Sequence, residues 1–228
     1  MYRIFIGWDP NEVPAYHALC HSIIRHASAP VSITPLKLDH LPMWRERHAL
    51  QSTEFSFSRF LVPYLCNYEG QALFMDVDML VTRDIVELFQ MGSERYAVSV
   101  VKHDYTPSST VKFLDQPQSP YPRKNWSSVM LFNNAQCRDL NPRTVNTKTG
   151  MDLHRFTWIH DSQIGSLPVT WNFLVGEYEL PDEVPANIHW TLGGPWFEEY
   201  RDAPYAGLWF EELEMVNGCR DIRPAAAA

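Results

Sequence analysis

Strand-like and helix-like segments alternate along residues 2–101, and this alternation constrains the fold more than any other feature of the chain. Residues 2–7 and 31–36 have the apolar pattern of buried strands, whereas residues 14–27 carry apolar side chains at helical spacing. A helix that connects two strands of one sheet usually leaves those strands parallel. The pattern therefore predicts an α/β fold, with a mostly parallel central sheet flanked by helices on both faces.

The rest of the chain extends this pattern and then departs from it. Residues 102–125 are rich in Pro, Ser, Lys and Asp and predict a long irregular loop, which in a compact domain often serves as a lid or a binding loop. Residues 141–160 show no defined pattern. The other expected elements are helices over 55–68 and 205–213, a short helix through Phe89 that residues 82–84 can cap, and strands over 72–81, 96–101 and 126–133.

Composition excludes several classes of protein. The chain has 228 residues without a composition break, which predicts one domain over residues 1–223 and a tail without function over 224–228. Its net charge of −8 argues against nucleic acid as a partner. We expect no transmembrane segment and no signal peptide. The four scattered cysteines predict reduced thiols in a cytoplasmic protein.

Two carboxylates, Asp76 and Asp78, interrupt the apolar strand predicted over residues 72–81. On an extended backbone alternate side chains share a face, so both are expected to point the same way. Like charges in apolar surroundings repel each other and lose hydration unless a cation compensates them. Carboxylate oxygens suit Mg²⁺ or Mn²⁺. A capped turn or a salt-bridged pair fits the same residues as well as a metal site does.

Histidines supply candidate third ligands. His189 is followed by Gly193 and Gly194, and a histidine joins carboxylates readily in Mn²⁺-type sites. The glycine pair would let backbone N–H groups approach an anion closely. His17 and His21 are spaced to share a metal on one helix, but no carboxylate partner is evident nearby, and Cys20 lies on a different face of the helix from both. We therefore predict that these two histidines form a solvated helix face.

Further candidates lie at the expected ends of strands and helices. Asp9 ends the first strand, where an open parallel sheet binds its ligands, although a turn before the next helix explains it equally well. Arg59 at a helix start is suited to a diphosphate. Asp161 and Gln163 could orient a substrate or stabilise positive charge at a carbon, with helix capping as the equal alternative.

In chain order these segments resemble the motifs of GT-A fold glycosyltransferases, closest to the family of glycogenin and the bacterial lipopolysaccharide galactosyl- and glucosyltransferases (family 8). The family usually has a lysine before its last Pro-Trp, where this sequence has Gly194, and its Asp-Gln pair is split by Ser162. Arg59, Lys102 or Arg123 would then contact the diphosphate. The segments that carry the resemblance are residues 4–9, 58–63, 73–78, 127–133, 161–167, 171–172 and 189–196.

The resemblance implies a metal-dependent hexosyltransferase that uses Mn²⁺ or Mg²⁺. The enzyme would move a sugar from a nucleotide-diphosphate donor, by default a UDP-sugar, to a glycan or glycolipid acceptor. Retention of configuration and a role in polysaccharide biosynthesis are implied in the same way, and peripheral contact with a membrane is compatible with it. A nucleotidyltransferase, a nucleotide-sugar hydrolase and a non-catalytic nucleotide-sugar-binding module remain open.

The resemblance also assigns residues to roles. Asp76, Asp78 and His189 would bind the metal, and Asp161 and Gln163 would act at the reacting sugar. The residues expected to contact the nucleotide-sugar are Gly7, Asp9, Arg59, Asp76, Ser127, Gly193 and Gly194.

Overall fold

A computed structural model describes residues 1–47, 51, 53–108 and 122–218 of the chain. Its centre is a six-stranded sheet with the strand order β2-β1-β3-β6-β5-β7. Only β6 runs antiparallel to its neighbours in this sheet, which confirms the mostly parallel α/β sheet. The strands are β1 (Tyr2–Gly7), β2 (Val31–Leu36), β3 (Gln71–Met75), β5 (Val98–Val101), β6 (Val129–Asn133) and β7 (Ile164–Leu167).

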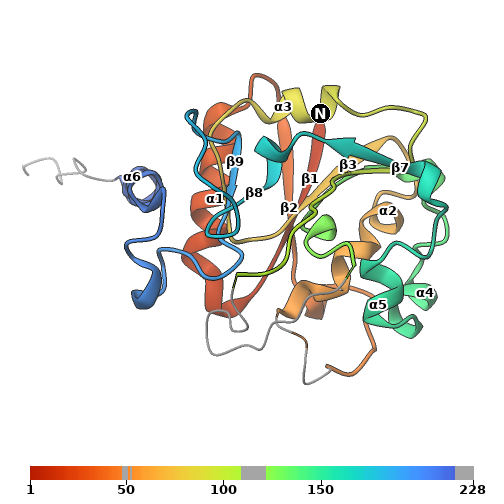
Figure 1. Ribbon diagram of the computed structural model, residues 1–228. Helices are drawn as coiled ribbons and strands as arrows, with labels where there is room; N and C mark the ends of the chain where they lie inside the picture. Colours follow the sequence, from red (N-terminus) through yellow and green to blue (C-terminus); the bar gives the residue numbers. More distant parts are fainter. Residues whose placement is uncertain (48–50, 52, 109–121, 219–228) are drawn as a thin grey trace, which may run out of the picture.

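Helices cover both sides of this sheet. In Figure 1, α1 (Val13–His26) and α6 (Ala206–Val216) lie together on one side, and α2 (Val62–Leu65), α4 (Pro142–Thr147) and α5 (Gly150–His154) lie on the other. Helix α1 begins with Pro14 in its first turn, where the missing N–H of proline leaves no hydrogen bond unmade. The helix ends at Ala27, whose extended backbone leads into β2 parallel to β1.

Two expected segments differ from the structure. The helix predicted over residues 55–68 consists of two 3-10 turns, Glu54–Ser56 and Ser58–Leu61, followed by α2. Pro63 has no N–H to donate to the carbonyl of Arg59, so a continuous α-helix is interrupted at this point. Residues 141–160, without a sequence pattern, contain α4 and α5, whose first turns are capped by the side chains of Asn141 and Thr149.

A second, smaller sheet with the order β4-β9-β8 was not foreseen. It consists of β4 (Met79–Val81), β9 (Asn187–His189) and β8 (Phe173–Leu174). The strand predicted over residues 72–81 is therefore two strands in different sheets, joined by residues 76–78. After β4, Asp84 caps α3 (Ile85–Gln90) by accepting a hydrogen bond from the amide of Val86 at 3.0 Å, as the sequence predicts.

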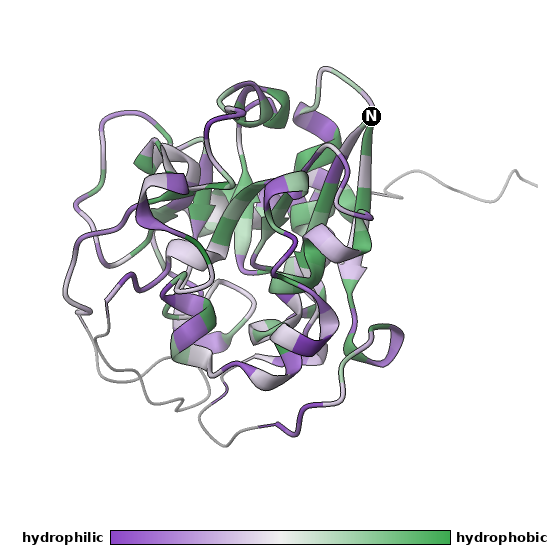
Figure 2. Cartoon of the chain, turned by 90° about the vertical axis from the view of Figure 1, so that its right-hand side faces the viewer, coloured by the Kyte–Doolittle hydropathy of each residue, from purple (hydrophilic) through white to green (hydrophobic). Residues whose placement is uncertain are grey.

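Apolar side chains from both layers form the core. Figure 2 shows the green, hydrophobic strands inside a largely hydrophilic shell of loops and helix faces. A separate apolar cluster joins the small sheet to α6 through the buried rings of Trp190 and Trp209. The cluster includes Ile188 of β9 and Trp190, the two neighbours of His189 in the sequence.

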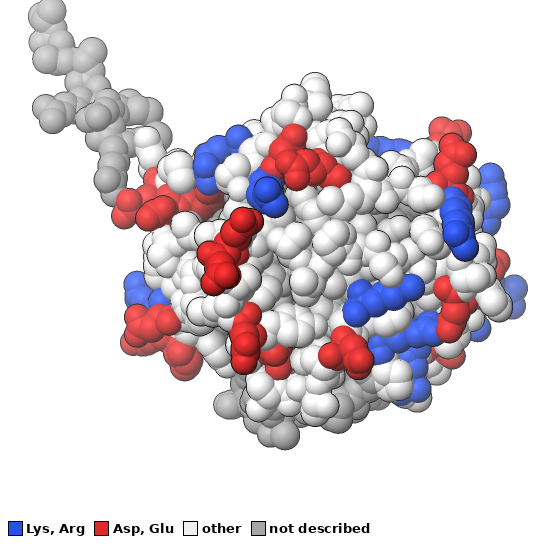
Figure 3. Space-filling model, turned by 45° about the horizontal axis from the view of Figure 1, so that its top comes forward, with Lys and Arg blue, Asp and Glu red and all other residues white. Residues whose placement is uncertain are grey.

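The surface agrees with a chain of mixed charge. On the face shown in Figure 3, acidic and basic side chains are interspersed. Within the described residues, none of the helices combines the length and the hydrophobicity that crossing a bilayer requires. Cys20, Cys66 and Cys137 are free thiols, whereas Cys219 and the predicted tail over residues 224–228 lie outside the described residues.

Candidate functional site

Asp76, Asp78 and His189 come together at the link between the two sheets. Asp76 follows β3, and its amide donates to the carbonyl of Ser128 at 2.9 Å. Asp78 precedes β4, whose first residue, Met79, pairs with His189 across the antiparallel β4–β9 ladder. One ligand atom from each of the three side chains lies within 4.8 Å of the other two. The tertiary structure thus assembles the predicted metal ligands.

The chemistry of this donor set fits a divalent cation. Two carboxylates and one imidazole suit Mn²⁺, and the carboxylates suit Mg²⁺ as well. Asp78 and His189 are buried, so their polar atoms are shielded from bulk water. His189 Nε2 lies 3.2 Å from Asp78 Oδ1, which directs this ring nitrogen toward the carboxylates. Three protein ligands leave further coordination positions for the oxygens of a substrate.

Arg59 forms an ion pair with Asp76, one of the three candidate ligands. Its Nη1 is 2.7 Å from Asp76 Oδ1 and donates to the carbonyl oxygen of Ser127 at 2.9 Å. The guanidinium is buried, with its Cζ 4.9 Å from the ring centre of Phe74 and 5.2 Å from that of Phe55. The salt-bridged pair that the sequence left as an alternative is therefore present for Asp76, at the same place as the candidate metal ligands.

Ser127 connects this arginine to a histidine that the sequence did not reveal. The hydroxyl of Ser127 lies 2.7 Å from Nδ1 of His154, the last residue of α5. Burial, and then the nearby charge of Arg59, lower the pKa of His154 to about 3, so the imidazole is neutral at physiological pH. Ser127, a predicted contact of the nucleotide-sugar, thus also binds Arg59, because its carbonyl oxygen accepts a hydrogen bond from the guanidinium.

A chain of polar contacts begins at Nδ1 of His189, the ring nitrogen that does not face Asp78. Nδ1 of His189 lies 2.8 Å from Oδ1 of Asn172, and Nδ2 of Asn172 lies 2.9 Å from Nε2 of His103. His103 Nδ1 in turn lies 2.8 Å from the hydroxyl of Tyr178. Burial, and then His189, lower the pKa of His103 to about 3. His103 and Tyr178 were missed because nothing in the local sequence places them beside residue 189.

Gly7 and Asp9 lie at and beyond the carboxyl end of β1. A Cβ on Gly7 would be 2.3 Å from the ring of Phe55, so the glycine lets this ring pack over the end of the strand. Asp9 Oδ1 accepts from the amide of Asn11 at 3.0 Å, and Oδ2 accepts from the amide of Glu54 at 3.1 Å. Asp9 therefore shapes the turn, as one of the two sequence interpretations has it.

The Gly193-Gly194 pair is required by packing. A Cβ on Gly193 would be 2.4 Å from the ring of Tyr200, and one on Gly194 would be 2.1 Å from Trp196. Gly193 also has a φ of +142°, which favours glycine. Its amide donates to the carbonyl of Trp190 at 2.9 Å, so an anion would have to displace this hydrogen bond.

Asp161 and Gln163 lie apart from the three candidate ligands. They precede β7, whereas Asp76 follows β3, and β3 and β7 run in the same direction through the sheet. The two pairs therefore occupy opposite edges of the sheet. Both carboxylate oxygens of Asp161 accept from Arg123 Nη2 at 2.7 Å, and this guanidinium lowers the pKa of Asp161. The catalytic role of Asp161 and Gln163 stays a prediction.

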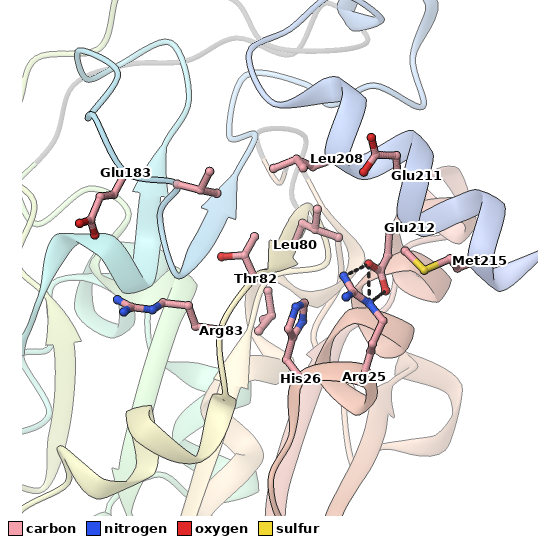
Figure 4. Close-up of a pocket in the computed structure, with 12 residues that line it drawn as sticks. Arg25, His26, Leu80, Thr82, Arg83, Glu183, Leu208, Glu211, Glu212 and Met215 are labelled. Carbon is pink, nitrogen blue, oxygen red and sulfur yellow. Dashed lines mark hydrogen bonds and ion pairs between the residues drawn. The ribbon is translucent and has the colours of Figure 1, made fainter.

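Pockets also lie outside the three-residue cluster. One of about 210 Å³ lies beyond β2, near the turn shaped by Asp9, and is lined by Leu38, Asp39, Leu41, Met43, Arg45, Arg47, Gln51, Glu54 and Phe57. Another of about 430 Å³ lies between α1, β4 and α6 (Figure 4). In this larger pocket Arg25 is hydrogen-bonded to Glu212, and none of the predicted site residues lines it.

The chain is similar to known proteins in sequence and in structure. It is 47% identical to the Arabidopsis thaliana protein named Protein CDI over an alignment of 226 residues, covering 95% of this chain and 87% of the relative. No protein-family model matches it. In structure it resembles the galactosyltransferase LgtC in complex with donor and acceptor sugar analogues, with a TM-score of 0.64, 12% identity, and coverage of 93% of this chain and 95% of that chain.

Two other solved structures are similar over part of their length. The bifunctional glycosyltransferase WbbM matches with a TM-score of 0.64 and 18% identity, covering 93% of this chain and 49% of that chain. The Streptococcus pneumoniae glycosyltransferase GlyE matches with a TM-score of 0.62 and 15% identity, covering 95% and 62%. The chain thus spans about half of WbbM and under two thirds of GlyE. These likenesses show that the chain has the GT-A fold.

Proposed function

Because the chain belongs to the family of the Arabidopsis thaliana Protein CDI and has the GT-A fold, we propose that it is a metal-dependent glycosyltransferase. It would move a sugar from a nucleotide-diphosphate donor, by default a UDP-sugar, to a glycan or glycolipid acceptor. The observation that carries this proposal is the convergence of Asp76, Asp78 and His189 within 4.8 Å at the carboxyl end of β3. Open α/β sheets bind nucleotides at this edge.

The three ligands would hold Mn²⁺ or Mg²⁺ against the diphosphate of the donor. The bound cation neutralises negative charge on the leaving nucleotide. Asp78 Oδ1 and His189 Nε2 lie 3.2 Å apart at this position, and Asp76 would share its charge between the cation and Arg59, which lies 2.7 Å away. The base would lie near the turn at Asp9, where the pocket lined by Glu54 opens.

Arg59 is the proposed substitute for the lysine that the related glycosyltransferases usually carry at the position of Gly194. It lies 2.7 Å from a metal-binding carboxylate, within reach of a diphosphate bound to the same cation. The two other candidates are engaged elsewhere, because Lys102 donates to the carbonyl of Ile164 at 2.8 Å and Arg123 binds Asp161. Ser127 would contribute by holding Arg59 in place through its carbonyl oxygen.

Several finer predictions still rest on the sequence alone. They include retention of configuration, a role in polysaccharide biosynthesis, the cytoplasmic location, the single domain over residues 1–223, and the roles of Gly193, Gly194, Asp161 and Gln163. The predicted lid over residues 102–125 falls largely on residues 109–121, which lie outside the described residues.

Product analysis tests the proposal. The protein is incubated with Mn²⁺ and a panel of UDP-, GDP- and CDP-sugars, with glycan and glycolipid acceptors, and the products are separated and weighed by mass spectrometry. A glycosyltransferase releases the nucleoside diphosphate and leaves the sugar on an acceptor. A nucleotidyltransferase makes or breaks the phosphoanhydride, a hydrolase releases free sugar without an acceptor, and a binding module gives no turnover. Any of the last three results contradicts the proposal.

A further inference from the structure

The two ring nitrogens of His189 face different groups. Nε2 lies 3.2 Å from Asp78 Oδ1, on the side of the candidate cation site, and Nδ1 lies 2.8 Å from Oδ1 of Asn172. A neutral imidazole carries one proton, for which the Asp78 carboxylate, 3.2 Å from Nε2, and the Asn172 amide oxygen, 2.8 Å from Nδ1, are competing acceptors. Only a proton on Nδ1 leaves Nε2 a lone pair for a cation. The orientation of the Asn172 amide is therefore decisive.

Ser128 determines that orientation. Its hydroxyl lies 2.7 Å from the carbonyl oxygen of Asn125, which can only accept, so the hydroxyl donates its single proton there. The same oxygen lies 2.7 Å from the Asn172 amide and has no second proton, so at this contact it can only accept. The Asn172 atom that faces Ser128 is thus the NH₂ nitrogen, and the amide oxygen faces His189.

His103 agrees with this orientation. The NH₂ group of Asn172 lies 2.9 Å from Nε2 of His103, which must accept the hydrogen bond. Because burial keeps His103 neutral, with a pKa of about 3, its one proton can lie on Nδ1 and be donated to the hydroxyl of Tyr178 at 2.8 Å. Asn172 is fully buried, so water does not offer its amide alternative partners.

We propose that Asn172 is a positioning residue that holds His189 as the Nδ1-protonated tautomer and keeps the Nε2 lone pair directed at the cation site beside Asp78. Oδ1 of Asn172 accepts the Nδ1 proton, and Ser128 and His103 prevent the amide from turning over. Outer partners of metal-binding histidines act in this way, and their loss weakens metal binding about 10- to 100-fold. The metal-affinity part of this inference rests on the proposed function; the tautomer does not.

Two measurements test the role of Asn172. The first is the tautomer of neutral His189 in the metal-free, ¹⁵N-histidine-labelled protein, read by long-range ¹H–¹⁵N NMR at alkaline pH. The second is the dissociation constant of Mn²⁺, read from the free ion by electron paramagnetic resonance. The variants are Asn172→Leu, which removes the amide at similar size, and Asn172→Asp, which keeps an acceptor. Asn134→Leu is the matched control, because Asn134 is also fully buried but binds the carbonyl of Glu69.

The proposal expects the proton of neutral His189 on Nδ1 in the wild type, in Asn172→Asp and in Asn134→Leu. In Asn172→Leu it expects a mixture with the Nε2-protonated form and Mn²⁺ affinity lower by about 10- to 100-fold. A wild-type proton on Nε2 would overturn it, as would an Asn172→Leu protein with unchanged tautomer and affinity. If Asn172→Leu does not fold, the wild type and Asn172→Asp still decide the tautomer. A wild type that binds no Mn²⁺ would contradict the proposed function and leave the tautomer result standing.

Discussion

At the scale of single residues, the site consists of buried or largely buried charged groups that pair with one another. Asp76 and Asp78 each contact one cationic or potentially cationic partner, Arg59 and His189. Removing one member of a buried ion pair leaves the other charge uncompensated, which is more costly than the net contribution of the pair itself. Substitutions of the proposed metal ligands are therefore expected to change metal affinity, whereas substitution of Arg59 is expected to change the free energy of unfolding.

Asp78→Asn should weaken Mn²⁺ binding by at least about 100-fold, because a first ligand contributes no less than the outer partners of a ligand. The substitution removes charge at nearly constant shape, so the folded structure is expected to persist. Isothermal titration calorimetry with Mn²⁺ and UDP measures the loss, and circular dichroism monitors the fold. Unchanged affinity for UDP in the presence of Mn²⁺ would disprove the metal assignment.

Arg59→Met should lower the free energy of unfolding by about 3–5 kcal/mol, because it leaves the largely buried Asp76 carboxylate without its guanidinium. In Asp76→Asn this charge is already absent, so the double variant is expected to lose less than the sum of the two single variants, with a coupling of about 0.5–3 kcal/mol. Urea unfolding in EDTA completes this double-mutant cycle. Additive losses would show that the 2.7 Å contact contributes nothing to stability.

At the scale of elements, α6 is held to α1 by polar contacts as well as by Trp209. Glu212 of α6 is buried and binds His21 and Arg25 of α1. The predicted solvated face of α1 at His17 and His21 is therefore wrong for His21, which faces another helix. The sequence concealed this contact because Glu212 lies 191 residues after His21.

Glu212→Gln should destabilise the protein near neutral pH and much less in acid. Burial would raise the pKa of Glu212, but the hydrogen bonds from Arg25 and His21 outweigh it and lower the pKa. A carboxyl group with a lowered pKa contributes stability above its unfolded value of about 4.3, and this contribution is lost as the pH falls through the folded pKa. At pH 7 we expect a loss of about 1–2 kcal/mol, since Arg25 and His21 are partly exposed to solvent.

Urea unfolding of both proteins between pH 3 and pH 7 measures this difference. Glu211→Gln is the matched control on the same helix, because Glu211 is exposed and should change stability by less than about 0.5 kcal/mol. A difference between wild type and Glu212→Gln that stays constant across the pH range would contradict the ion-pair explanation.

At the scale of the whole molecule, the candidate metal site joins the two sheets. Asp76 follows a strand of the large sheet, Asp78 precedes β4 of the small one, and His189 ends β9. A cation held by all three would therefore tie the large sheet to the layer that carries α6. Binding to the folded state alone stabilises that state by mass action.

Mn²⁺ with the nucleotide of the donor should raise the melting temperature of the wild type. At a ligand concentration 100 times the dissociation constant the stabilisation is about 2.7 kcal/mol, which for a protein of this size corresponds to about 5–11 °C. Thermal unfolding with UDP, GDP or CDP identifies the preferred base. EDTA and Asp78→Asn should each abolish the shift; a nucleotide-dependent shift that survives both would show binding without the metal site.

The sequence by itself determined the architecture and the candidate metal ligands. Apolar periodicity and turn residues act locally, so β1, α1, β2 and the cap at Asp84 could be predicted from neighbouring residues. Two carboxylates in an apolar segment need a positively charged partner in any fold that buries them. For this reason Asp76 and Asp78 could be recognised as a candidate site from their neighbours alone. His189 was found through the motif around it.

Only the tertiary structure decided what surrounds those ligands. The break after Met75 depends on the ladder between β4 and β9, and the partners of His189 and Arg59 come from segments distant in sequence. Likewise, the motif around Asp161 did not show that this residue would precede β7 and bind Arg123. Hydrogen-bond partners and buried charges are set by the packing of distant segments, which local patterns do not encode.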